Sequence, residues 1–217
     1  MSEWYPMMMK IEGRRCIVVG GGKVAERKTE GLLQAKANVT IVSPRLTPLL
    51  QQWSEAGSLH WIKREAVEAD LTGATLIFAA TDLPEINKWV FEVAEGLAIP
   101  VNIADDGELG SFINPAVLRR GELVLTASAS GAGPALATRI IQELSAQYGP
   151  EYKRYIETLR AIRAIVKDEV ADASERRALL KAAVTDEALQ EWQSGSLLQD
   201  KERLIARLRQ RADELKG

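Results

Sequence analysis

Between residues 15 and 103, short apolar runs rich in β-branched residues alternate with longer segments that have the apolar spacing of helices. Continuous apolar strands separated by helices predict a parallel sheet covered on both faces, because the crossover helices must pack against the sheet. The sequence therefore predicts a doubly wound α/β domain. The predicted strands are residues 16–19, 39–42, 59–63, 75–80 and 99–104, and the predicted helices are residues 24–35, 47–56 and 83–96.

Composition and charge exclude several classes of protein and partner. The chain has 217 residues, of which 46% are hydrophobic, and its net charge of -2 gives no reason to expect nucleic acid or an anionic membrane as a partner. Its start resembles neither a signal peptide nor a membrane anchor, and no segment approaches the roughly 20 apolar residues of a membrane helix. The single cysteine, Cys16, lies in an apolar run and is expected to be buried, which fits a cytoplasmic protein.

A glycine-rich turn follows the first predicted strand. Gly20, Gly22 and Ala25 fit the pattern G-x-G-x-x-A, which in this position binds the pyrophosphate of a dinucleotide. The amide groups and the partial positive charge of the following helix N-terminus favour an anion there. Alternatively, the glycines only connect the strand to the helix.

The acidic residue that usually binds the adenosine ribose at the end of the second strand is missing. Ser43, Pro44 and Arg45 stand there instead. Arg45 has three open roles: pairing with a 2′-phosphate, which would favour NADP, lying over the adenine, or facing solvent. At the end of the fourth strand, Thr81 is expected either to line the cofactor cleft or to help start the next helix, and Asp82 is expected to cap that helix.

Two aspartates, Asp105 and Asp106, follow the fifth predicted strand and should lie on the same rim as the glycine turn. A carboxylate there could remove a proton while a nicotinamide accepts a hydride. The alternative is a solvated turn, because Asp and Gly are turn formers by themselves.

After residue 103 the pattern changes to two more strand candidates, residues 111–113 and 123–128, and a helix that opens at Pro134. A second glycine-rich turn precedes this helix, and its free amides at Gly133, together with Arg119, Arg120 and Arg139, would suit an anionic substrate. Alternatively, the turn only starts the helix and the arginines face water. Beyond Tyr148 the chain is predicted to be helical. The predicted division is a nucleotide-binding domain (1–113), a middle segment (114–148) and a helical domain (149–217).

These residues resemble the bifunctional precorrin-2 dehydrogenase/sirohydrochlorin ferrochelatases of sirohaem biosynthesis. The resemblance covers residues 5–144 well, and the helical tail only in general character. It rests on the segments VVGGGKVAERK, VTIVSP, AATD, VNIADD, SFINPA and RGELVLTASASGAGPALATRI, which occur in one consistent order.

The resemblance implies an NAD-binding Rossmann domain, a middle segment used for intertwined dimerisation and a helical domain that closes over the tetrapyrrole. It also implies oxidation of precorrin-2 to sirohydrochlorin with NAD, and in some members the insertion of ferrous iron, which would approach Asp105 only transiently. The family's essential aspartate falls on Asp105. Two departures are expected to matter. Lys36 stands where relatives often have a helix-ending glycine, and a chain that ends at Gly217 has no room for the methyltransferase domain of the fused enzymes, so it is expected to act as a stand-alone dehydrogenase.

The site predictions combine both lines of reasoning. The predicted cofactor-binding residues are Gly20, Gly21, Gly22, Lys23, Val24, Ser43, Pro44, Arg45 and Thr81. The predicted substrate-binding residues are Asn114, Arg119, Arg120, Ser128, Gly133 and Arg139. No permanent metal site is expected, because one cysteine and one histidine (His60) make no zinc-type ligand set. A competing hypothesis is a non-catalytic NAD(P)-sensing module whose helical tail contacts a partner.

Overall fold

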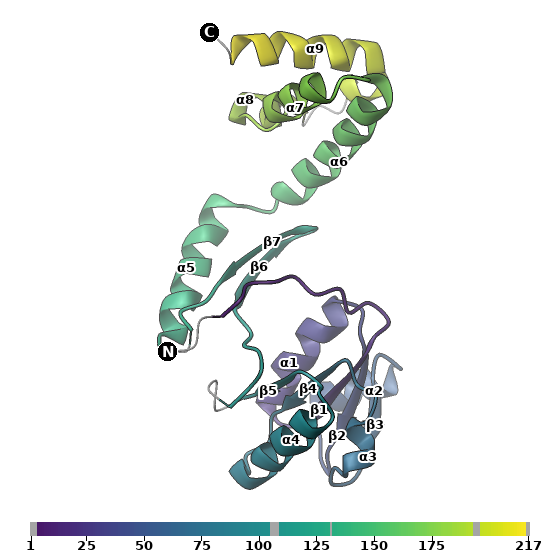
Figure 1. Cartoon of the computed structure of the whole chain (residues 1–217), viewed down its shortest axis with the longest axis vertical. Helices are drawn as coiled ribbons and strands as arrows, with labels where there is room; N and C mark the ends of the chain where they lie inside the picture. Colours follow the sequence, from purple (N-terminus) through teal and green to yellow (C-terminus); the bar gives the residue numbers. More distant parts are fainter. Residues whose placement is uncertain (1–3, 105–108, 131, 193–195, 216–217) are drawn as a thin grey trace. The chain divides into compact units, whose positions relative to one another are not determined.

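The computed structural model describes residues 4–104, 109–130, 132–192 and 196–215 (Figure 1). The chain forms two compact units, Met1–Asn114 and Pro115–Gly217. The further division of the second unit into a middle segment and a helical domain stays a prediction.

The first unit contains a parallel five-stranded sheet in the order β3-β2-β1-β4-β5, as the alternating pattern predicts. Neighbouring residues of β1 point to opposite faces: Cys16 and Val18 join a core with α1 and α2, while Ile17 and Val19 join a core with α3 and α4. This confirms the doubly wound α/β class. In chain order the elements are β1 (Arg15–Val19), α1 (Lys23–Gln34), β2 (Asn38–Val42), α2 (Pro48–Glu55), β3 (His60–Ile62), α3 (Glu68–Leu71), β4 (Leu76–Ala79), α4 (Pro84–Gly96) and β5 (Val101–Ile103).

Cys16 is fully buried in this sheet, as expected, and burial raises the pKa of its thiol to about 11. His60 lies on β3 and is exposed.

Two local predictions for the first unit are wrong. Residues 111–113 form no strand. A backbone bond joins the segment to β5, from the Ser111 N–H to the Val101 carbonyl at 2.8 Å, and side chains make further contacts: the Ser111 hydroxyl accepts the Val101 N–H at 2.7 Å, and the Asn102 amide donates to the Phe112 carbonyl at 2.9 Å. Asp82 does not cap α4. The residue at the cap is Leu83, which has no capping side-chain bond, and Pro84 occupies the first helical turn.

Lys36 follows α1 in the left-handed region, with φ of 56°. The Lys36 N–H donates to the Leu33 carbonyl and the Ala37 N–H to the Leu32 carbonyl, which is the Schellman arrangement that favours glycine. The departure noted in the sequence therefore falls on a position that needs positive φ.

We expect Lys36→Gly to raise the free energy of unfolding by about 1 kcal/mol, because glycine adopts this conformation without steric cost. Lys36→Ala is the matched control, since it also removes the exposed ion pair with Glu12 but keeps a Cβ atom. Urea unfolding of the three proteins measures the effect. If the glycine and alanine variants were equally stable, the backbone at Lys36 would not be strained.

The second unit begins with an antiparallel hairpin and continues as helices (Figure 1). The hairpin turns at Gly121, which has φ of 62°. The following helix starts after Gly133 at Pro134, as expected. The strand β6 was not predicted. The elements are β6 (Ala116–Arg120), β7 (Leu123–Ala127), α5 (Pro134–Gln147), α6 (Tyr152–Glu169), α7 (Ala173–Ala182), α8 (Asp186–Trp192), the 3₁₀ helix η1 (Ser196–Gln199) and α9 (Lys201–Glu214).

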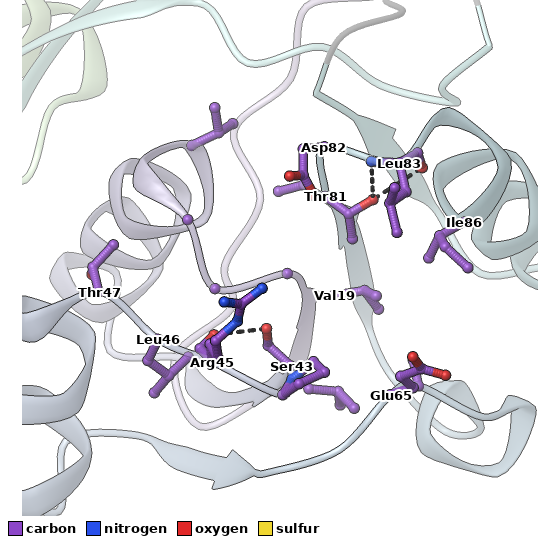
Figure 2. A pocket seen from close by; sticks show the side chains of 18 of the residues that line it. Val19, Ser43, Arg45, Leu46, Thr47, Glu65, Thr81, Asp82, Leu83 and Ile86 are labelled. Atoms are coloured by element: carbon purple, nitrogen blue, oxygen red, sulfur yellow. Dashed lines mark hydrogen bonds between the residues drawn. The ribbon is translucent and has the colours of Figure 1, made fainter.

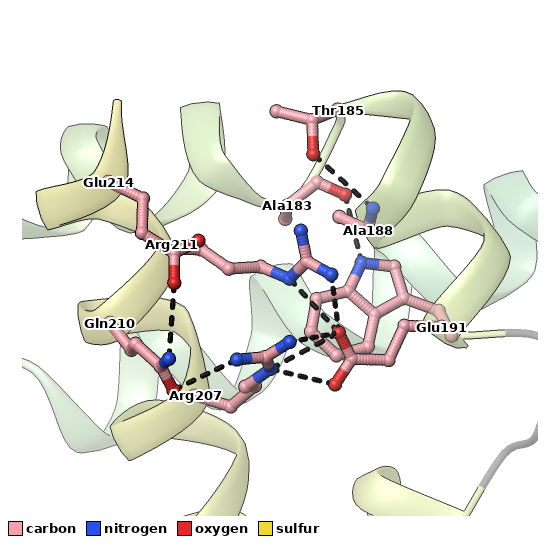
Figure 3. Close-up of polar contacts among 9 residues, drawn as sticks. Ala183, Thr185, Ala188, Glu191, Arg207, Gln210, Arg211 and Glu214 are labelled. Atoms are coloured by element: carbon pink, nitrogen blue, oxygen red, sulfur yellow. Dashed lines mark hydrogen bonds and ion pairs between the residues drawn. The ribbon is translucent and has the colours of Figure 1, made fainter. Parts of the chain in front are cut away.

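An ionic cluster ties α8 to α9 beside the helical core (Figure 3). Arg207 donates to both carboxylate oxygens of Glu191, and Arg211 donates to Oε2 of the same group at 2.5 and 3.0 Å. The Arg211 guanidinium also lies 5.8 Å from the ring centre of Trp192. Hydrogen bonds from Arg207, and then from Arg211, hold the pKa of Glu191 below its ordinary value, although burial acts the other way.

We expect Glu191→Gln to lower the free energy of unfolding at pH 7 by about 1–2 kcal/mol, because the two arginines lose their anionic partner. The folded-state pKa of Glu191 is lowered, so its contribution is present above the unfolded value of about 4.3 and is lost as the pH falls through the folded value. The stability difference between the wild-type protein and the variant should therefore shrink in acid. Glu187→Gln, an exposed change on the same helix, is the control. A difference that does not change with pH would exclude this role of the carboxylate.

Candidate functional site

A cleft of about 780 Å³ opens at the carboxyl ends of the strands in the first unit (Figure 2). Ser43, Arg45 and Leu46 lie on one side of it, and Thr81 and Leu83 lie on the other. All nine residues predicted from the sequence to bind the cofactor line this one cleft. The structure thus brings the glycine turn and the ends of β2 and β4 together.

The three glycines of the turn have different structural roles. Gly20 has φ of 118°, and a Cβ atom there would collide with the backbone carbonyl of Ala80 at the end of β4. A Cβ atom on Gly21 would collide with the Arg45 carbonyl and lie 2.9 Å from the Ser43 hydroxyl. Around Gly22, by contrast, the space is open within 4 Å. Gly20 and Gly21 therefore allow the turn to pack against the backbone of Ala80 and Arg45, whereas Gly22 leaves room for a ligand.

The N-terminus of α1 opens toward this space. Its cap is Gly22, and no side chain in the described part of the chain caps the first turn, so early amide groups of the helix are left for a ligand. The N-terminus of a 12-residue helix favours an anion. Glu26, one turn further on, is held by the Thr47 hydroxyl at 2.6 Å and by Lys23 at 2.9 Å. These hydrogen bonds, that from Thr47 first, lower the pKa of Glu26.

The loop after β2 is fastened to the glycine turn and to β3. The Thr47 N–H donates to the Gly21 carbonyl at 2.9 Å, and the Ser43 hydroxyl donates to the Arg45 carbonyl at 2.8 Å. The Trp61 indole N–H donates to the Ser43 carbonyl at 2.9 Å. Pro44 and Arg45 are exposed at the cleft, so the three alternatives for the Arg45 side chain stay open.

Thr81 combines the two roles between which the sequence could not choose. It lines the cleft, and its hydroxyl donates to Oδ1 of the buried Asn87 at 2.8 Å while accepting the Leu83 N–H at 3.2 Å. The Asn87 amide donates back to the Thr81 carbonyl at 3.1 Å. This pair fixes the start of α4 in place of the expected cap by Asp82.

The sequence did not predict every residue of the cleft wall; Glu65, Ala66, Leu83 and Ile86 are among those that it missed. Glu65 and Ala66 follow β3, and the rule that ligands lie at the carboxyl ends of parallel strands could have identified them. Leu83 and Ile86 carry no such signal, because apolar residues in a first helical turn are common.

The predicted catalytic residue, Asp105, lies outside the described residues, as does Asp106. Its role stays a prediction. Among the described residues, no three His, Cys, Asp or Glu side chains come together as a possible metal site.

The six predicted substrate-binding residues do not line this cleft. Arg120 contributes to the second unit, where its guanidinium donates to the Tyr148 carbonyl at 2.9 Å and to the Ser145 carbonyl at 3.4 Å, at the end of α5. Arg139 pairs with Glu143 on the exposed face of α5, and the Ser128 hydroxyl accepts the Ser130 N–H. Gly133 precedes α5, while Asn114 and Arg119 are exposed. Substrate binding by these residues stays a prediction.

None of the helices that the structure describes has both the length and the apolar run needed to cross a membrane.

Comparison with known proteins places this cleft in context. The model of a family described as NAD(P)-binding matches residues 7–116. Siroheme synthase 1 of Aeromonas salmonicida is 35% identical over 81% of the chain, and the siroheme synthase of Methylobacillus flagellatus is 36% identical over the same share. The chain spans 37% and 38% of the lengths of these two relatives.

A solved structure is similar over nearly the whole chain. SirC, a precorrin-2 dehydrogenase, superimposes with a TM-score of 0.74 at 28% identity, covering 95% of this chain and 100% of SirC.

Proposed function

The chain belongs to the NAD(P)-binding family of the siroheme synthases and of SirC, and from this premise we propose that it oxidises precorrin-2 to sirohydrochlorin with NAD. The observation that carries the proposal is the cleft, in which an open glycine, an uncapped helix N-terminus and two strand ends surround one space. The likeness to SirC supports the choice of substrate.

The residues present fit a dinucleotide. The free amides of the first turn of α1 would bind the pyrophosphate, and the open space at Gly22 allows its close approach. Leu46, in the loop after β2, offers apolar surface to the adenine. NAD, when bound, supplies the acceptor for a hydride. We propose NAD over NADP on the likeness to the family, which uses NAD. Because that family commonly lacks the ribose-binding acid after β2, its absence here does not argue for NADP.

The reaction removes two hydrogen atoms from precorrin-2. One leaves as a hydride with its electron pair, and the other leaves as a proton. We propose that the Asp105 carboxylate accepts this proton as general base. The anaerobic reaction tests the function: precorrin-2 and NAD should yield sirohydrochlorin and NADH, and a sensing module would bind NAD without consuming it.

Iron insertion is a second candidate activity, supported by the relatives that are named siroheme synthases. Ferrous iron would enter as substrate, and Asp105 would accept pyrrole protons as the macrocycle binds the ion. Supplying sirohydrochlorin and ferrous iron without NAD isolates this step. A rate equal to the enzyme-free background would restrict the protein to dehydrogenation.

We also propose that the protein is a homodimer that associates through the hairpin and α5. Val117 on β6 and Leu136 and Ile140 on α5 expose 42%, 52% and 38% of their surfaces. A two-stranded hairpin is marginally stable by itself, so a partner surface over these residues would stabilise it. Sedimentation equilibrium should give twice the chain mass. Cytoplasmic location stays a prediction.

A further inference from the structure

We propose that Glu65 accepts hydrogen bonds from the adenosine half of the bound dinucleotide, in place of the acid that is missing after β2. The inference rests on the proposed function, because it assumes that a dinucleotide occupies the cleft. Two carboxylates, Glu65 and Asp82, line the described cleft. Figure 2 shows Glu65 at the lower edge of the cleft, below Ile86.

The order of the strands indicates which half of the dinucleotide meets Glu65. The glycine turn follows β1, and the adenosine usually lies on the side of β2, where the ribose-binding acid stands in other proteins. Glu65 follows β3, which is the next strand beyond β2, whereas Asp82 follows β4 on the opposite side of β1. Glu65 is therefore the carboxylate on the adenosine side.

The hydrogen-bonding groups of the Glu65 carboxylate and of an adenosine are complementary. An ionised carboxylate only accepts hydrogen bonds, and the donors of an adenosine are its ribose hydroxyls and its 6-amino group. Hydrogen bonds to a charged acceptor are also stronger than those between neutral groups. A carboxylate at this place would in addition repel a 2′-phosphate, which opposes the attraction that Arg45 would offer in one of its three open roles.

The loop that carries Glu65 is fixed by its neighbours. Arg64 makes a bidentate pair with Asp70, with distances of 2.6 and 2.7 Å, and donates to the Glu65 carbonyl at 2.8 Å. Asp70 is 6% exposed and also accepts the Val67 N–H at 2.9 Å. The Arg15 guanidinium donates to the Asp70 carbonyl at 2.8 Å.

These contacts hold the backbone of Glu65 at the cleft, although its side chain is exposed. The loop therefore places Glu65 at the edge of the cleft before a ligand arrives. Such support by neighbouring side chains is what a binding residue requires.

Calorimetric titration of the full chain with NAD tests the inference. Glu65→Gln should weaken NAD binding by about 5- to 20-fold, because the charged acceptor is lost. Glu68→Gln is the matched control: it removes the same charge three residues away, on α3 and outside the lining of the cleft, and should change the affinity by less than about twofold.

Two analogues identify the donor. If the ribose donates, the wild-type preference for NAD over 2′-deoxy-NAD should disappear in Glu65→Gln; if the amino group donates, the preference over the hypoxanthine dinucleotide should disappear. Wild-type affinity of Glu65→Gln for NAD would overturn the inference and leave the proposed function standing. Failure of the wild-type chain to bind any dinucleotide would overturn both.

Discussion

Asp105→Asn is expected to lower the turnover of precorrin-2 by about 10²- to 10⁴-fold, the range that a general base contributes. The amide of asparagine cannot take up the proton that leaves as the hydride is transferred. Binding of NAD should change little, since the pyrophosphate and adenosine contacts that we propose follow β1, β2 and β3. Stopped-flow measurement of NADH formation under anaerobic conditions, with NAD affinity measured by calorimetry, checks both statements.

Asp106→Asn is the matched control, because it removes one negative charge from the adjacent residue of the same segment. It should lower turnover far less than Asp105→Asn. Equal losses of turnover in the two variants would mean that the negative charge of the segment matters and that Asp105 is not a specific base. An unchanged rate in Asp105→Asn would remove this residue from the mechanism.

The second large effect that we expect distinguishes the adjacent residues Gly21 and Gly22. Gly21→Ala should lower the free energy of unfolding by about 3 kcal/mol, because the new methyl group meets the Arg45 carbonyl, lies 2.8 Å from Leu46 Cδ2, and cannot be accommodated without moving the loop after β2. Gly22→Ala should leave the stability within about 1 kcal/mol, since the space around it is open. Its methyl group should instead weaken NAD binding by about tenfold or more, because it stands where the pyrophosphate approaches.

Thermal unfolding without ligand and calorimetric titration with NAD measure the two effects on the same samples. We expect opposite outcomes: Gly21→Ala unfolds at a lower temperature than the wild-type chain, whereas Gly22→Ala folds normally but binds NAD poorly. If Gly22→Ala binds NAD as the wild-type chain does, the pyrophosphate does not lie at this turn.

The sheet and the glycine turn could be predicted because their signals are local. An apolar run such as residues 39–42 has few alternatives to a buried strand, and Gly20 and Gly22 stand at a spacing that only the strand-to-helix turn explains. The positive φ at Lys36, by contrast, was foreseen from the resemblance, because relatives often have a glycine at this helix end.

The features that were missed depend on contacts between distant residues. The four-residue helix α3 is too short to show periodicity, and it is held by the pair of Arg64 with Asp70 and by Arg15, which is 55 residues away from Asp70. Glu65 becomes a residue of the site only because this loop folds against the cleft. Likewise, the sequence shows Arg120 as a free cation, whereas the structure uses it at the end of α5, 25 and 28 residues further along the chain.

The most direct test of the central claim is a single-turnover reaction of the full chain with precorrin-2 and NAD in the absence of oxygen. We expect one NADH for each sirohydrochlorin formed. The rate should be strongly reduced in Gly22→Ala at low NAD and restored toward the wild-type value at saturating NAD. A folded chain that binds NAD but forms neither product would contradict the account.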